Sequence, residues 1–107
     1  MSRLPCEVIV RGVLPALRAL IARKLVRDHG FTQASVADFL GVTQATVSHY
    51  LASKRGKLVV DICEPEELEL AANEIAVRIA HGDLDPDGLR REICKFCLKL
   101  KKRRGLL

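Results

Sequence analysis

Aromatic residues are scarce in this chain of 107 residues, which has three phenylalanines, one tyrosine and no tryptophan. Because 49% of the residues are nevertheless apolar, the core has to be built mainly from aliphatic side chains. Proteins that read single-stranded RNA commonly stack its bases on exposed aromatic side chains. The scarcity of such side chains therefore argues against RNA binding.

Long apolar runs are also absent. No stretch approaches the roughly 18 consecutive apolar residues of a membrane-spanning helix, and the first residues, MSRLPCE, do not resemble a signal peptide. We therefore expect a cytoplasmic protein that is not attached to a membrane.

Residue patterns typical of an enzyme are missing as well. The three histidines, His29, His49 and His81, have no serine or cysteine nucleophile at a recognisable spacing. The chain also has no phosphate-binding loop. We therefore expect no enzymatic activity.

Basic residues exceed acidic ones, since 18 lysines and arginines against 13 aspartates and glutamates give a net charge of +5. A mildly basic chain suits an anionic partner, such as nucleic acid or a membrane surface. The length predicts a single domain, or a domain with a short extension.

The stretch from residue 31 to residue 57 holds two short amphipathic segments, Gln33–Leu40 and Thr43–Ala52. Apolar side chains recur in each at spacings of three and four residues, as they do on one face of a helix. Between them, Gly41 stands where a chain that leaves a helix commonly turns left-handed, and Thr43 is a good N-cap for the second helix. The apolar positions are Val36, Ala37, Leu40, Val47, Tyr50 and Leu51.

This pattern resembles the helix-turn-helix family of bacterial, phage and archaeal transcriptional regulators. The matching residues are Val36, Ala37, Leu40, Gly41, Val42, Val47 and Tyr50. The preceding stretch, PCEVIVRGVLPALRALIARKL, is similar to small archaeal regulators and to the DNA-binding part of archaeal regulators that carry a thiamine-phosphate synthase domain. The resemblance implies an all-α, lambda-repressor-like helical bundle that binds specific sequences of double-stranded DNA. The alternative is that the two segments are core helices of an unrelated bundle.

Three longer helices are predicted around the two segments, at Pro15–His29, Pro65–His81 and Pro86–Lys102. We assign residues 1–60 to a DNA-binding part. Residues 61–107 then form two further C-terminal helices, which complete the core and pair two copies into a homodimer. Two short apolar segments, Glu7–Val10 and Leu58–Cys63, are ambiguous between a strand and a helical turn or an extended linker.

A recognition helix offers its exposed polar side chains to base edges in the major groove. Gln44 can pair with adenine through two hydrogen bonds, while Ala45 and the methyl group of Thr46 can meet the methyl group of thymine. The other candidates are Gln33, Thr43, Ser48 and His49 for bases or the DNA backbone, and Lys54, Arg55 and Lys57 for phosphates. Ordinary solvent exposure is the alternative for each of them. The basic tail Lys101–Arg104 is a further, less specific candidate.

The four cysteines, Cys6, Cys63, Cys94 and Cys97, allow three interpretations. Their thiolates together suit an iron–sulfur cluster or zinc, and Cys94 and Cys97 form a Cys-x-x-Cys on one side of a predicted helix. Disulfides, either structural or as a redox switch, and simple burial as small apolar side chains are the alternatives. The first two would make the regulator metal- or redox-responsive. The alternative to a DNA-binding regulator is a sensor or interaction module, in which the cysteines bind the metal or form the disulfide and the helix-turn-helix serves protein assembly.

Overall fold

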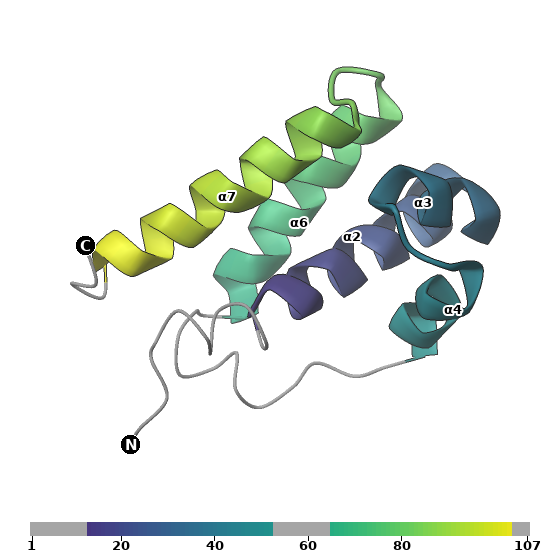
Figure 1. Cartoon of the computed structure of the whole chain (residues 1–107), viewed down its shortest axis with the longest axis horizontal. Helices are drawn as coiled ribbons and strands as arrows, with labels where there is room; N and C mark the ends of the chain where they lie inside the picture. Colours follow the sequence, from purple (N-terminus) through teal and green to yellow (C-terminus); the bar gives the residue numbers. More distant parts are fainter. Residues whose placement is uncertain (1–12, 53–64, 104–107) are drawn as a thin grey trace.

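The structure, a computed structural model, describes residues 13–52 and 65–103 of the chain. This part is all-helical and contains no strand, which confirms the predicted all-α class. Its helices are α2 (Leu14–His29), α3 (Gln33–Leu40), α4 (Gln44–Ala52), α6 (Pro65–Ala80) and α7 (Pro86–Arg103) (Figure 1). The ambiguous segments 7–10 and 58–63 lie outside the described residues, as does the predicted domain boundary at residue 60.

Helix α2 is the centre of the fold, because it packs against α3, α4 and α6. Figure 1 shows it between the pair α6 and α7 and the pair α3 and α4. Pro15 lies in its first turn, where a missing backbone N–H is tolerated. The helix ends at Gly30, whose φ of 73° is left-handed and is readily adopted by glycine. Both ends were therefore predictable from the positions of these two residues.

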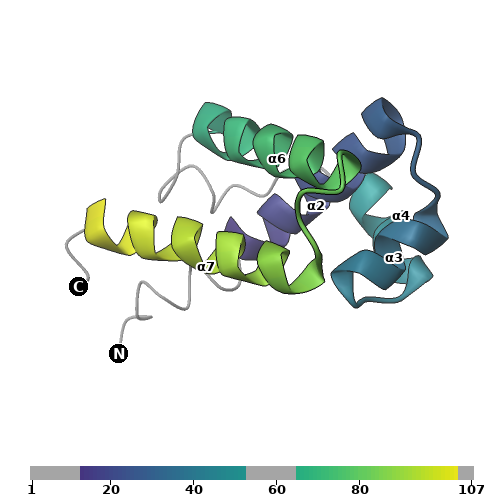
Figure 2. The ribbon, with the colours of Figure 1, turned by 90° about the horizontal axis from the view of Figure 1, so that it is seen from above.

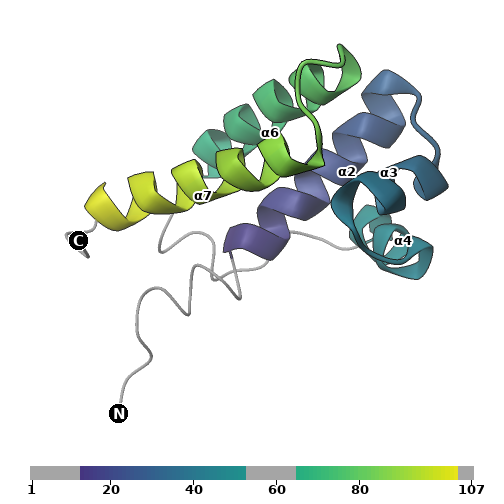
Figure 3. The same ribbon diagram turned by 45° about the horizontal axis from the view of Figure 1, so that its top comes forward.

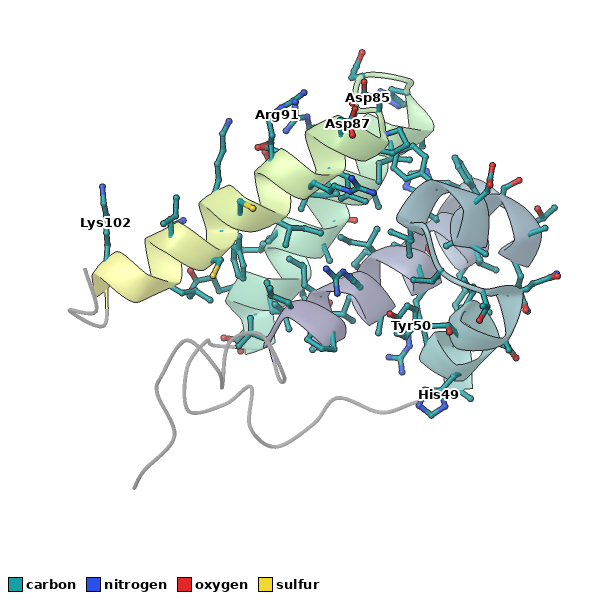
Figure 4. All side chains as sticks on the ribbon, viewed as in Figure 1. His49, Tyr50, Asp85, Asp87, Arg91 and Lys102 are labelled. Carbon is teal, nitrogen blue, oxygen red and sulfur yellow. The ribbon has the colours of Figure 1, made fainter. Side chains whose placement is uncertain are left out.

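Helices α6 and α7 form an antiparallel pair that lies side by side in Figures 2 and 3. Gly82 ends α6 with a φ of 78°, and Asp85 caps α7 because its Oδ1 accepts the N–H of Gly88 at 2.6 Å. Figure 4 shows Asp85 and Asp87 at the start of α7, where the helix dipole favours negative charge. An aspartate directly before a proline is a recognisable helix-start signal, so this cap can be read from the sequence.

The core is aliphatic as expected, with Phe96 as its one buried aromatic residue among those described. The apolar faces of α2, α6 and α7 are largely buried, although Leu14, Val26, Ala71 and Cys97 are only half-buried against the core. Leu84 is buried although it lies in the turn between α6 and α7. Helix boundaries differ from the predicted ones by at most one residue, which is within the usual uncertainty of helix ends.

None of the helices in residues 13–52 and 65–103 is long and apolar enough to cross a membrane.

An ion pair between Arg78 of α6 and Glu92 of α7 joins the two helices. The hydrogen bond from Arg78 is the main reason why the pKa of Glu92 is lowered below its ordinary value of 4.5, although partial burial acts in the opposite direction. The ammonium group of Lys95, 3.3 Å from the same carboxylate, lowers the pKa further.

We expect Glu92→Gln to destabilise the protein at neutral pH and to have little effect in acid. A carboxylate with a lowered pKa in the folded state adds stability above its pKa in the unfolded chain, and this contribution disappears as the pH falls through the folded value. Urea unfolding of both proteins between pH 7 and pH 3 should therefore give a difference in free energy that shrinks below pH 4.5. Glu66→Gln, at an exposed position on α6, serves as the control. A difference that is the same at every pH would contradict the assignment.

Candidate nucleic-acid interface

Helices α3 and α4 are joined by a turn of three residues that is fixed by hydrogen bonds. Gly41 has a left-handed φ of 70°, and the N–H of Val42 donates to the carbonyl oxygen of Ala37 at 2.9 Å. The Thr43 hydroxyl then accepts the N–H of Thr46 at 3.1 Å, as an N-cap does. The predicted roles of Gly41 and Thr43 are confirmed, and α4 begins at Gln44 because Thr43 is its cap.

A second cap lies at the start of α3 and was not predicted. The Thr32 hydroxyl accepts the N–H of Ser35 at 3.0 Å, and the same hydroxyl lies 2.9 Å from the Ser35 hydroxyl. A threonine directly before an amphipathic segment is a recognisable helix-start signal, so the sequence did contain the information. Both helices of the pair thus start at a defined residue.

One face of α4 is anchored in the protein and the other is exposed. Val47 has no exposed surface, and Tyr50 and Leu51 pack half-buried against the core. On the other side, four of the predicted DNA-contacting residues are exposed, namely Gln44, Ala45, Ser48 and His49. In Figure 4, Tyr50 lies on the side of α4 that is turned to α2, whereas His49 points away from the rest of the molecule.

Thr43 and Thr46 use their hydroxyl groups within the protein, although Thr43 itself is exposed. Their hydroxyl oxygens lie 2.8 Å apart and share a hydrogen bond, and Thr46 is half-buried. Gln33, at the start of α3, is half-buried too. The side chains of α4 that the fold leaves pointing outward are therefore mainly Gln44, Ser48 and His49.

Two arginines of α2 hold the carboxyl end of α4. Arg23 Nε donates to the carbonyl oxygen of Tyr50 at 3.2 Å, and Arg27 Nη2 donates to that of Leu51 at 3.5 Å. Cations next to the last carbonyl groups of a helix complement its dipole. Sequence reasoning missed this contact, although the spacing of four residues places both arginines on one side of α2.

Several predicted site residues lie outside the described part of the chain. These are Lys54, Arg55, Lys57, Cys6 and Cys63. Of the other two cysteines, Cys94 is exposed and Cys97 is half-buried, and both are free thiols. In residues 13–52 and 65–103, no group of three or more histidines, cysteines, aspartates or glutamates is arranged to hold a metal ion.

No protein family, curated protein or solved structure matches the chain.

Proposed function

We propose that this protein is a helix-turn-helix transcriptional regulator of the lambda-repressor-like type that reads double-stranded DNA with α4. One observation supports this more than any other. Helix α4 is fixed on one side by Val47 and by the two arginines of α2, and its opposite side exposes Gln44, Ala45, Ser48 and His49. The proposal includes a cytoplasmic location and no catalytic activity.

The dimensions of α4 suit the major groove. An α-helix with its side chains is about 10–12 Å in diameter, and the groove is about 12 Å wide. The residues at the amino end of a recognition helix usually contact the base edges. Gln44 is the first residue of α4, and its amide can both donate to and accept from adenine. Ala45 next to it can contact the methyl group of thymine.

The beginning of α3 is suited to the DNA backbone. The Thr32 hydroxyl accepts the N–H of Ser35, which leaves the N–H groups of Gln33 and Ala34 for a phosphate, and the positive end of the helix dipole attracts phosphate. Gln33 is the first residue of α3 and can donate to a phosphate oxygen from there. Lys54, Arg55 and Lys57 supply positive charge that binds phosphates without regard to sequence.

Selection of bound duplexes from a random pool tests this function. We expect enrichment of one short sequence, and an affinity that falls linearly with salt concentration on logarithmic scales, since phosphate contacts release counterions. Equal retention of all duplexes across the pool, or no retention at low salt, would refute the proposal.

A second proposal concerns regulation through the cysteines, and it rests on the exposed thiol of Cys94 beside Cys97 on α7. Cys94 and Cys97 are three residues apart and thus face the same side of the helix. Together with Cys6 and Cys63 they would provide thiolates for zinc or an iron–sulfur cluster, and the DNA affinity would then respond to metal or oxidants. A pure sample with no zinc, no visible absorption and four titratable thiols would remove this proposal.

A further inference from the structure

The outer side of the α6–α7 pair carries a groove lined by four apolar and five charged residues. Leu70, Ala71 and Ile75 of α6 and Phe96 of α7 line it. Leu70 is 70% exposed, more than any other large apolar side chain among the described residues. A single exposed leucine is common on protein surfaces, so the charges at the edges of the groove have to indicate what covers it.

The two edges of the groove have opposite charge. Glu67 and Glu74 lie on the α6 side, and Lys95 and Lys99 lie on the α7 side next to Glu92, whose carboxylate is already paired with Arg78 and Lys95. The whole helices show the same contrast. Helix α6 carries four glutamates and one arginine, whereas α7 carries seven lysines or arginines and two acidic residues. A partner that covers this groove must therefore offer a basic surface to α6 and an acidic surface to α7.

A second copy of the same chain meets this requirement in only one of two simple arrangements. A twofold axis that runs along the groove places α6 of each copy over α7 of the other, so that opposite charges meet. A twofold axis that runs across the groove places α6 over α6 and α7 over α7, so that like charges meet. Like charges at close range are unfavourable, and the first arrangement is favoured.

The register of the helices agrees with the first arrangement. Arg78 of α6 is paired with Glu92 of α7 and therefore lies level with it. Because the two helices are antiparallel, moving one turn back along α6 to position 74 corresponds to moving one turn forward along α7 to position 96. Rotation about a twofold axis along the groove does not change the position of a residue along the groove. Glu74 of one copy therefore lies level with the stretch of α7 from Lys95 to Lys99 in the other.

We propose that the α6–α7 groove is a homodimer interface, closed by a second copy of this chain with the twofold axis along the groove. The four helices then form an antiparallel bundle with Leu70 inside it. The interface goes beyond the proposed DNA binding and does not use α4, which lies on the other side of α2 in Figures 1 and 2. A dimer presents two copies of α4, as regulators that read two half-sites do.

Sedimentation equilibrium of the full chain without DNA tests the interface. The unchanged protein is expected to be a dimer. Glu74→Lys and Lys99→Glu each turn two symmetry-related attractions into repulsions, and each is expected to raise the dimer dissociation constant about tenfold. An equimolar mixture of the two variants should form a heterodimer with the original affinity, because every α6–α7 contact between the copies then joins opposite charges.

Leu70→Glu and Leu98→Glu form a matched pair for the apolar contact. Leu98 is 48% exposed on α7 and is not among the residues that line the groove. Leu70→Glu should give a monomer, while Leu98→Glu should leave the dimer intact. The inference would be overturned if the unchanged protein is a monomer or if the dimer survives Leu70→Glu. It would also be overturned if the mixture of Glu74→Lys and Lys99→Glu stays monomeric. A monomer that still selects a DNA sequence would overturn the interface and leave the proposed function standing.

Discussion

Leu25→Ala is expected to lower the free energy of unfolding by about 2–5 kcal/mol, the usual effect of removing a buried leucine side chain. Leu25 has no exposed surface, and its carbonyl oxygen accepts the N–H of Phe31 at 3.0 Å, where the chain leaves α2 for α3. Because α2 packs against α3, α4 and α6, a cavity at a fully buried position of α2 weakens the centre of the core. The melting temperature should fall by about 4–8 °C for each kcal/mol lost.

Leu98→Ala is the matched control for this prediction. The same atoms are removed, but Leu98 is 48% exposed, and the expected change is within about 0.5 kcal/mol. Urea unfolding at a fixed protein concentration measures both variants. Equal losses for Leu25→Ala and Leu98→Ala would contradict the assignment of α2 as the centre of the core.

Gln44→Ala is expected to weaken binding to the selected duplex by about 1–3 kcal/mol, which is about 5–150-fold, while leaving the affinity for unrelated duplexes nearly unchanged. Gln44 is exposed at the first position of α4, and alanine is a good helix former, so the fold is retained. The variant should no longer discriminate between bases at one base pair of the selected site, and it should discriminate as before at the other base pairs.

Asn73→Ala, at an exposed position on α6, is the control for Gln44→Ala and is expected to bind like the unchanged protein. Equilibrium titration with the selected duplex and with single-base variants of it measures both proteins. An equal loss of affinity for every duplex would show that Gln44 acts on the backbone or on folding instead of on a base.

The helices could be predicted because their boundaries are encoded locally. Gly30, Gly41 and Gly82 all have left-handed φ angles just after a helix, and Asp85 and Thr43 supply caps from their own side chains. Each of these signals involves residues only a few positions apart. The apolar periodicity of α2, α6 and α7 is local in the same way, and it identified most of the buried core.

Contacts between distant residues could not be predicted in this way. Arg23 and Arg27 reach carbonyl groups 27 and 24 positions further along the chain, and nothing in their immediate surroundings distinguishes them from other surface arginines. Leu84 is buried although it lies in the turn between α6 and α7, and its position in the sequence does not indicate this. The hydrogen bond between the Thr43 and Thr46 hydroxyls also joins side chains that are far enough apart in the sequence to be treated as independent. It occupies the hydroxyl group of Thr46, which the sequence predicted to lie free at a base.

The basic face of α7 is the main competitor of α4 for DNA. Arg91 and Lys102 project outward from α7 in Figure 4, and seven of the 18 residues of the helix are lysine or arginine. Such a surface attracts phosphate without sequence preference. Binding through α7 would therefore depend on salt as binding through α4 does, but it would not discriminate between duplexes.

The most direct measurement is the change of backbone amide NMR shifts when the protein binds the selected duplex. The largest changes are expected at Gln44, Ala45 and Ser48 and at the start of α3, with smaller ones along α6. Changes concentrated on Arg90, Arg91 and Lys95, with α4 unaffected, would contradict the claim that α4 reads the DNA.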